Sequence, residues 1–213
     1  MSEKYDYFVG IDPGLSGAIS VIDKKGNISI YDVPIRKIPN PNKKAKSKTK
    51  KDIDIAGIVK IFEELKGKVL VGIEFVHAMP NQGVVSVFNF GCGYGIYKGI
   101  IIANHFEIIE ISPQTWKKYF KNDLEIDEIT NIKKQISELR KKNKTLKGSQ
   151  SKKTNKKERS ALNKQIKSIA KDQSRIVAAQ KFADQKDMFK LKKHDGRADA
   201  SLIALYCFEN YYK

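Results

Sequence analysis

Two apolar, β-like runs of this chain each end in a single acidic residue, and no other feature limits its fold as strongly. Asp12 follows the run Tyr7–Ile11, and Glu74 closes the run Val69–Ile73. A charge after so apolar a segment is costly unless it is paired or bound to a cation. If the two runs are parallel neighbours in one sheet, their acidic ends lie at the same edge. The sequence therefore predicts an acidic site at a sheet edge, with a turn-capping role for each acid as the alternative.

A second pair of acids lies near the end of the chain. Asp195 and Asp199 are one helical turn apart at the start of an apolar segment, Gly196–Tyr211, that is typical of a helix. Carboxylates are the ligands that Mg²⁺ prefers, and two such ions can hold both the attacking and the leaving oxygen of a phosphodiester. The four acids thus predict a nuclease-type site with two Mg²⁺ ions, or Mn²⁺ in their place. A favourable interaction with the helix dipole is the alternative for the second pair, and it suits Asp195 better.

The net charge of +17 is concentrated in two segments. Residues 36–51 contain one arginine and seven lysines without an acid, and residues 133–171 contain 15 basic residues against two glutamates. These segments carry more positive charge than the whole chain, so the remainder is mildly acidic. Clusters of this kind beside an acidic site indicate a polyanionic partner such as nucleic acid. Solvated lysine-rich loops are the alternative.

The remaining composition predicts an intracellular protein. No apolar run approaches the roughly 20 residues needed to span a bilayer, and the first residues lead directly into a strand, so we expect no signal peptide, no transit peptide and no membrane partner. Cys92 and Cys207 match no metal-ligand spacing. Two reduced thiols in a reducing compartment are expected, with a disulfide as the alternative. Nothing indicates a small-molecule cofactor.

Hydrophobic patterning predicts one α/β domain over residues 1–213, with a mixed five-stranded sheet flanked by helices. The expected strands cover residues 5–11, 17–22, 28–33, 69–74 and 106–111. The prolines and lysines of residues 34–51 indicate a flexible loop. The expected helices of the body cover residues 53–65, 81–104, a short segment from Pro113, 175–183 and 196–211. The glycines of residues 81–104 would permit close packing against the sheet or a second subunit.

Residues 123–173 form a separate lysine-rich unit. Apolar residues recur there at heptad-like spacing, and Gly148 interrupts them, which is typical of two helices folded into an antiparallel hairpin. The apolar positions are Ile129, Ile132, Ile136, Leu139, Leu146, Leu162, Ile166, Ile169 and Ile176, with Asn143 in the seam. We expect this inserted basic hairpin to grip nucleic acid, with disorder in the absence of DNA as the alternative.

The order of the acids and elements resembles the RNase H-like fold and, within it, the RuvC-like Holliday junction resolvases. The motifs are Ile11-Asp12-Pro13-Gly14-Leu15-Ser16-Gly17-Ala18, Ile73-Glu74, Pro113-x-x-Trp116-Lys117 and Asp195…Asp199-Ala200. Phe90-Gly91-x-Gly93-Tyr94-Gly95, Ser174-Arg175-x-Val177-Ala178-Ala179 and Lys192-Lys193-His194-x-Gly196-Arg197-Ala198 are similar to the plant chloroplast resolvases and their viral and phage relatives. A viral or phage origin is therefore open. The resemblance excludes the lysine-rich hairpin.

The resemblance implies a homodimeric, metal-dependent endonuclease that places symmetric nicks in opposing strands of a four-way DNA junction. Asp12, Glu74, Asp195 and Asp199 would be the catalytic metal ligands, and Lys117 would contact the scissile phosphate. In bacterial members the last two carboxylates are usually three residues apart, whereas here they are four apart, so Asp195 and His194 both remain candidates for the inner-sphere ligand. The residues expected to contact DNA are Phe75, His77, Lys117, Lys118, Arg175, Lys192, Lys193, His194 and Arg197.

Purely structural roles are the alternatives for several of these residues. Phe75 and His77 could stack on unpaired bases or pack in the core. Arg175 and Arg197 could bind phosphates or form intramolecular salt bridges, and His194 could cap a helix. An RNase H-like nuclease for other branched DNA or RNA–DNA hybrids is the nearest alternative function, followed by a binding protein without catalysis. An actin-like ATPase or sugar kinase is the last alternative, and we expect it least because such enzymes need a second, duplicated lobe for which 213 residues leave no room.

Overall fold

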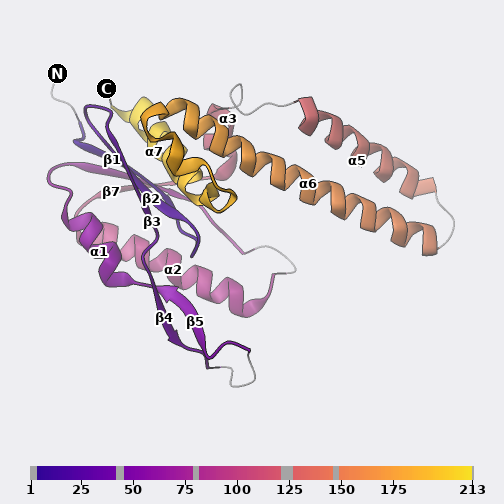
Figure 1. Ribbon diagram of the computed structural model, residues 1–213, viewed down its shortest axis with the longest axis horizontal. Helices are drawn as coiled ribbons and strands as arrows, with labels where there is room; N and C mark the ends of the chain where they lie inside the picture. Colours follow the sequence, from indigo (N-terminus) through magenta and orange to yellow (C-terminus); the bar gives the residue numbers. More distant parts are fainter. Residues whose placement is uncertain (1–3, 42–45, 79–81, 121–126, 146–148, 213) are drawn as a thin grey trace.

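A five-stranded sheet forms the centre of the molecule (Figure 1). The structure is a computed structural model that describes residues 4–41, 46–78, 82–120, 127–145 and 149–212. The strands, in spatial order, are β3 (Ile28–Asp32), β2 (Ala18–Asp23), β1 (Tyr7–Asp12), β6 (Val69–Glu74) and β7 (Glu107–Ile111). The first three strands in sequence pair antiparallel, whereas β1, β6 and β7 run parallel. The predicted α/β class and mixed five-stranded sheet are confirmed.

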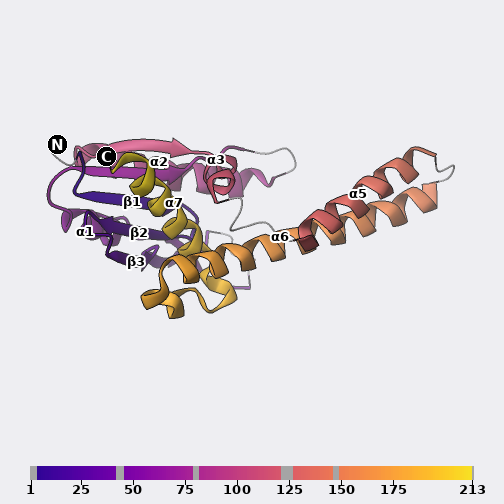
Figure 2. The ribbon, with the colours of Figure 1, turned by 90° about the horizontal axis from the view of Figure 1, so that it is seen from above.

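Helices cover both faces of this sheet (Figure 2). α1 (Ile55–Glu63) and α2 (Val84–Ala103) pack on one face, and α3 (Pro113–Tyr119) and α7 (Asp195–Tyr211) pack on the other. The predicted start of α3 is confirmed, because the Ser112 side chain accepts a hydrogen bond from the Thr115 amide and proline occupies the first turn. Two separate apolar cores result, one on each side of the sheet.

Strand alternation decides which residues meet α7. Phe8 and Leu70 belong to the core under α7, whereas Val9, Val71 and their equivalents two residues on face α1 and α2. The residues between them on the α7 face are Gly10 and Gly72, which are register partners in β1 and β6. A Cβ atom on Gly10 would lie 2.1 Å from the carbonyl oxygen of Ala200, so α7 can cross the sheet here only because a side chain is missing.

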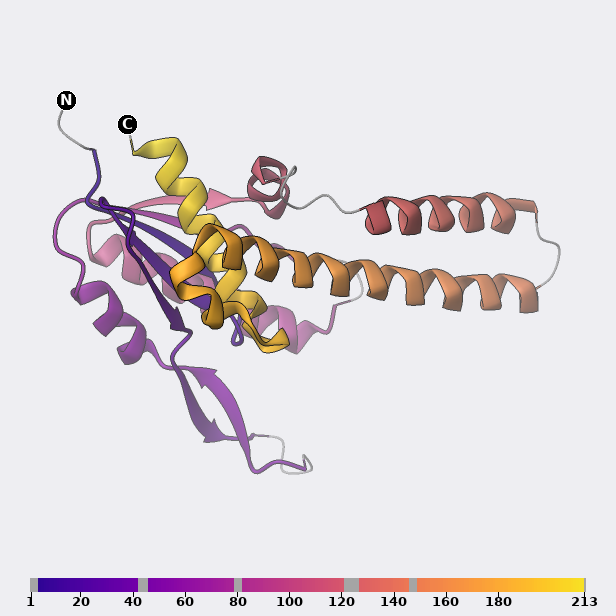
Figure 3. The same ribbon diagram turned by 45° about the horizontal axis from the view of Figure 1, so that its top comes forward.

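The flexible loop predicted for residues 34–51 is wrong. β4 (Ile35–Pro39) and β5 (Thr49–Ile53) pair antiparallel as a two-stranded sheet of their own, separate from the main sheet. Pro39 lacks an amide proton, but it lies at the end of β4, where the lost ladder bond costs little. The hairpin projects from the body (Figure 3). Its lysines Lys43 and Lys44 lie outside the described residues.

The helical hairpin is present as predicted, but its boundary with the body is different. α5 (Asp127–Thr145) and α6 (Ser149–Lys181) lie side by side and leave the body as a long arm (Figures 1 and 2). Ile132 and Ile136 are buried between them, and the Asn155 side chain donates to the Leu139 carbonyl. The side chains of Ile129, Asn143, Leu146 and Ile166 lie outside the described residues.

No separate helix begins at residue 175. α6 is one helix of 33 residues that runs from the tip of the arm into the body, where Val177 and Ala178 join the core under α7. Ile176 is 54% exposed and does not continue the seam of the arm. Two short 3₁₀ segments, Ala183–Phe189 and Lys192–His194, then connect α6 to α7.

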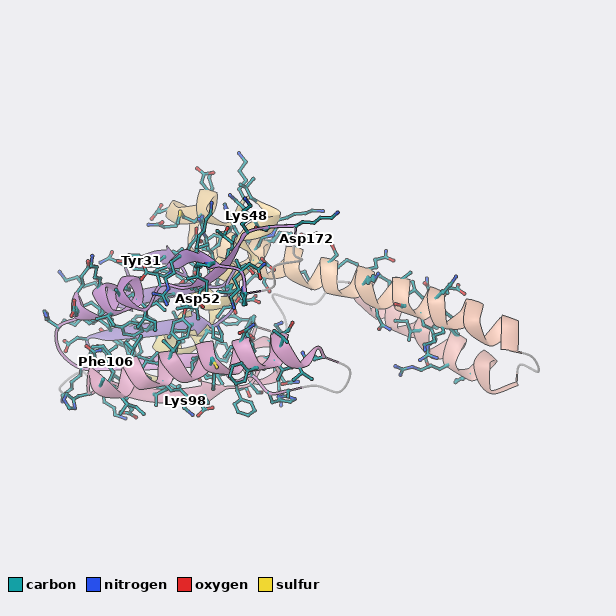
Figure 4. All side chains as sticks on the ribbon, turned by 90° about the horizontal axis from the view of Figure 1, so that it is seen from below. Tyr31, Lys48, Asp52, Lys98, Phe106 and Asp172 are labelled. Atoms are coloured by element: carbon teal, nitrogen blue, oxygen red, sulfur yellow. The ribbon has the colours of Figure 1, made fainter. Side chains whose placement is uncertain are left out.

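α2 has one buried side and one exposed side. It is long and apolar enough to cross a membrane by length and composition alone, although no apolar run of that kind was expected. One side of α2 packs on the sheet through Tyr97, Ile100 and Ile101, which belong to the core shared with β1 and β6. No element of the described residues covers the other side (Figure 4). α2 therefore presents an apolar face that the described part of the chain leaves uncovered.

Candidate functional site

The two strand-end acids lie side by side on the α7 face of the sheet. Asp12 is the last residue of β1 and Glu74 is the last residue of β6, and their predecessors Ile11 and Ile73 are register partners. Both acids continue the alternation that begins with Gly10 and Gly72, so they project towards α7. The amide of Gly14 donates to Asp12 Oδ1 at 3.2 Å and fixes that carboxylate against its own loop.

The start of α7 brings the second pair of acids to the same place. Arg197, in the first turn of α7, holds both oxygens of Asp32 at the end of β3, with Nε–Oδ1 and Nη2–Oδ2 distances of 2.6 Å. A bidentate pair of this kind fixes orientation as well as position. The charges of both Asp195 and Asp199 act on Asp12. The structure thus brings together the four carboxylates that the sequence singles out.

The carboxylates repel one another in a poorly hydrated site. Burial, together with the charges of Asp199 and Glu74, raises the pKa of Asp12 to about 7. Burial also raises the pKa of Asp199 to about 6, although the nearby charge of Lys117 and a hydrogen bond with Ser174 act in the opposite direction. Such shifts mean that the site holds more negative charge than its own protein surroundings neutralise.

The donor set fits a hard divalent cation. All four side chains offer carboxylate oxygens, and Asp199 Oδ1 is buried without a hydrogen-bond partner among the described residues. The described residues contain no group of three or more His, Cys, Asp or Glu side chains whose arrangement, as it stands, could hold a metal ion. A dication would relieve the repulsion that raises these pKa values and would occupy the free oxygen of Asp199.

Trp116 and Ser174 hold two of the acids, and the sequence analysis assigned neither residue a role. The buried indole of Trp116 donates from Nε1 to Glu74 Oε1 at 3.2 Å. Ser174, which is buried near the body end of α6, hydrogen bonds with Asp199. Trp116 stands in a motif that the resemblance highlighted, which is the one sequence signal that could have found it. Ser174 also stands in such a motif, Ser174-Arg175-x-Val177-Ala178-Ala179, but only the path of α6 shows that it meets Asp199.

Lys117 lies beside the acids, as the resemblance implied. It follows Trp116 in α3, and its Nζ lies 4.9 Å from the centre of the Trp116 ring. Its charge lowers the pKa of Asp199, which places the ammonium group within electrostatic reach of that carboxylate. Lys117 is nevertheless exposed, so its Nζ is accessible to a ligand.

The loop after β6 presents two rings to solvent. Phe75 and His77 are both exposed, and their rings stack with centroids 5.9 Å apart. Core packing, which the sequence left open for both, is therefore excluded. Because the loop directly follows Glu74, the stacked pair stands next to the acids.

The other residues expected to contact DNA divide into two groups. Arg175 and Arg197 form intramolecular ion pairs with Asp172 and Asp32, the alternative that the sequence left open. His194 is buried and caps its own turn, since its Nδ1 accepts from the Leu191 amide at 3.4 Å. Burial and the charges of Arg197 and Lys193 lower the pKa of His194. The exposed group comprises Lys118, Lys192 and Lys193.

The two cysteines of the chain are free thiols. Cys92 is exposed on α2, whereas Cys207 is buried on the sheet-facing side of α7, where burial raises its pKa to about 12. Comparison with known proteins identifies no family model and no curated protein that matches this chain.

Proposed function

We propose that this protein is a metal-dependent endonuclease of the RNase H-like fold that cuts four-way DNA junctions by paired, symmetric nicks. The observation that carries the proposal is the convergence of four carboxylates from two parallel strand ends and one helix on the same face of the sheet. Strand order and direction are those of the RNase H-like fold, which supports the finer fold assignment. A nuclease for other branched DNA or for RNA–DNA hybrids would use the same site and remains the second candidate.

The chain's own residues supply the ligands and their orientation. The charges of Glu74, Asp195 and Asp199 all act on Asp12, so these four carboxylates would together hold Mg²⁺, or Mn²⁺, which has the same ligand preference. Trp116 orients Glu74, and Ser174 orients Asp199. Asp195 is favoured over His194 as the fourth ligand, because its charge acts on Asp12 whereas His194 is engaged in its own turn. Bound between these carboxylates, Mg²⁺ would activate water for attack on the phosphodiester and stabilise the leaving oxygen.

Exposed groups around the acids would position the substrate. Lys117 can place a positive charge on the scissile phosphate, since its ammonium group is exposed and close to Asp199. The stacked rings of Phe75 and His77 offer a surface for an unpaired base at the point where strands exchange. The basic arm formed by α5 and α6 would hold duplex arms through their phosphates.

Paired nicking requires two sites related by symmetry, and α2 provides a surface for a second copy. Its uncovered side carries Val84, Phe88 and Ile102, which are 83%, 70% and 61% exposed. On the same side, Gly91, Gly95 and Gly99 would each have open space around an added Cβ. A flat, uncharged stripe of this kind lets an identical helix approach closely across a two-fold axis. It offers no charged group that could form an ion pair with a charged partner.

Cleavage of a labelled synthetic junction tests the proposal. Wild type and Asp12→Asn should be compared with Mg²⁺ on a four-way junction, a duplex, a flap and an RNA–DNA hybrid. We expect paired symmetric nicks on the junction alone, and their loss in Asp12→Asn with binding retained. Equal cutting of the other substrates would establish the second candidate, and tight binding without any cutting by wild type would exclude an enzyme.

Sedimentation of Phe88→Glu tests the second-copy surface. We expect wild type to sediment as a dimer and the variant as a folded monomer that makes single, uncoordinated nicks. Lys98→Gln on the same helix is the control, because it changes the charge of α2 at the Lys98–Glu110 ion pair without placing a charge among the exposed apolar residues. A wild-type monomer at micromolar concentration, both free and bound to a junction, would overturn this part of the proposal.

A further inference from the structure

The β4–β5 hairpin is attached to the body only at its base. Ile53, the last residue of β5, is buried and contacts α2 near Gly93. The amide of Asp54 donates to the Pro34 carbonyl at 2.9 Å and closes the base. Beyond this point the described part of the hairpin makes no strand pairing with the main sheet. Its outer residues therefore contribute little to the core of the protein.

The register of the hairpin places like charges opposite each other. Lys37 pairs with Lys51 across the two strands, and both side chains are exposed. Directly opposed residues share a face of the ladder, and like charges at such positions are destabilising. The hairpin's acid does not relieve them, because Asp52 pairs with Arg36 on the other face at 3.2 Å. A folded ladder that holds two lysines in register, with no acid of the described residues paired to either, is well suited to an external anion.

A groove lies between one of these lysines, Lys51, and the loop that follows Asp12. It has a volume of about 340 Å³, and strand β5 and helix α2 complete its walls. Pro13 and Leu15 form one wall, Lys50 and Lys51 form the second, and Asn89 and Phe90 form the third. Pro13 directly follows Asp12 in the chain, so the groove begins next to the loop that carries this acid, although none of the four carboxylates lines it. Its size is that of a site for a small ligand or a single nucleotide unit, which is too small for a duplex.

We propose that this groove and the lysine face of the β4–β5 hairpin bind a single DNA strand as it leaves the acidic site. Lys37 and Lys51 hold successive phosphates, and the groove holds a nucleotide between Leu15 and Phe90. The hairpin is thus a second nucleic-acid arm, distinct from the α5–α6 arm, that acts on the cut strand rather than on duplex. The identity of the ligand rests on the proposed function, whereas the location of the binding surface rests on the register and the groove.

Binding without metal tests the lysine face independently of cleavage. Anisotropy of a labelled single strand and of a labelled four-way junction should be measured in EDTA over a range of salt concentrations. For Lys37→Gln/Lys51→Gln we expect the slope of log K against log salt for the single strand to fall by about 1.4, or about 0.7 per phosphate, which corresponds to about 25-fold weaker binding at 0.1 M salt. Lys37→Arg/Lys51→Arg should restore binding.

The control variant removes the same charge elsewhere. Lys25 and Lys66 are exposed at the opposite end of the sheet, in the turn after β2 and in the loop before β6. Lys25→Gln/Lys66→Gln should keep the wild-type slope. An equal loss in both glutamine variants would reduce the effect to net charge and overturn the proposal. Loss of binding to phosphatidylserine vesicles with DNA binding retained would also overturn it and would assign the hairpin to a membrane surface.

A thiol crosslink tests the groove. Cys92 lines it and is exposed, whereas Cys207 is buried. A four-way junction that carries an alkyl disulfide on successive nucleotides around the crossover should exchange with the Cys92 thiol, releasing the small alkyl thiol and forming a mixed disulfide at one or two adjacent positions. The crosslink should be absent in Cys92→Ser and weakened in Lys37→Gln/Lys51→Gln. No crosslink at any position would exclude the groove, whether or not wild type cleaves the junction.

Discussion

α7 and α2 are both long apolar helices that cross the same sheet, one on each face, but glycine serves them in opposite ways. Under α7 the glycines are in the strands, where Gly10 lets the helix backbone approach β1 and Gly72 leaves room for the side chains of Cys207 and Ile203. In α2 the glycines are in the helix itself, and Gly91, Gly95 and Gly99 face open space. The strand glycines are therefore filled by α7 of the same chain, whereas the glycines of α2 leave space for another molecule.

The difference separates chemistry from assembly. α7 carries two of the four acids, so its distance from the sheet sets the geometry of the site. α2 carries none of them and instead has exposed Val84 and Phe88 on its free side. Substitutions on the α7 side should therefore change stability and catalysis together, whereas substitutions on the free side of α2 should leave the isolated fold intact.

The largest effect is expected at the crossing point of α7. In Gly10→Ala the new methyl group would lie 2.1 Å from the Ala200 carbonyl oxygen and 2.3 Å from the Ala204 nitrogen, both backbone atoms that cannot rotate away. We expect a loss of about 3 kcal/mol in the free energy of unfolding, as for severe overpacking. Urea denaturation measures it, and an unchanged midpoint would contradict the described crossing of α7 over β1.

A pH dependence should appear on the α7 side alone. Burial and neighbouring acids hold the pKa of Asp12 near 7, above its value of 3.8 in an unfolded chain. The stabilising contribution of this protonated carboxyl is complete below pH 4 and is lost as the pH rises through 7. Without metal, Asp12→Asn should therefore be more stable than wild type at pH 8, on the order of 2 kcal/mol after solvent screening, and the two should converge at pH 4.

Denaturation in EDTA at several pH values checks this, and Mg²⁺ should remove most of the difference at pH 8 by stabilising wild type. Gly91→Ala on α2 serves as the pH control, because no titratable group lies within 4 Å of its added methyl group. A constant offset between wild type and Asp12→Asn over the whole range would contradict the raised pKa of Asp12.

A smaller effect is expected when Glu74 loses its orientation. Trp116→Phe removes the Nε1 donor, which lies 3.2 Å from Glu74 Oε1, and keeps most of the apolar volume. A hydrogen bond to a charged group contributes about 2 kcal/mol, so unfolding and nicking should both respond. If Trp116 orients Glu74, the variant should also need a higher Mg²⁺ concentration than wild type for half-maximal nicking. A stability loss with an unchanged Mg²⁺ requirement would make Trp116 a packing residue only.

The smallest effect is expected on the free side of α2. Gly91→Ala and Gly99→Ala add a methyl group in open space, and alanine favours a helix over glycine by up to about 1 kcal/mol. Each variant should unfold at slightly higher urea concentration as a monomer, while its dimer dissociates more readily because the helices cannot approach as closely. A clear destabilisation of the monomer would mean that this side of α2 packs inside the chain after all.

Most of the body could be predicted from local sequence. β1, β6 and α3 follow from an apolar run or a cap within a few residues. The order of Asp12, Glu74 and Asp199 along the chain predicted the shared site. The partners of these acids could not be predicted in the same way. Trp116 and Glu74 are 42 residues apart, and Arg197 and Asp32 are 165 apart, so only the packed sheet and helices bring them together.

The two wrong predictions, a loop over residues 34–51 and a helix beginning at residue 175, also have physical causes. Three prolines and a lysine run are typical of a loop, whereas β4 and β5 form through a register, including the pair Arg36 and Asp52, that composition does not reveal. The change from lysine-rich to apolar sequence near Ser174 indicated an element boundary. α6 crosses that boundary without a break, since backbone hydrogen bonding within a helix is indifferent to whether a side chain meets solvent or the core.

This unbroken α6 has a mechanical consequence. Its 33 residues form a rod about 50 Å long, and Ser174, which holds Asp199, lies about 38 Å along it from the outer end. A rotation of α6 by about 5° near Ser174 would move its outer end by about 3 Å. A displacement of about 3 Å at the outer end would in turn rotate the helix by about 5° near Ser174. The arm that would grasp a duplex and the hydroxyl that steadies one carboxylate are thus parts of a single lever.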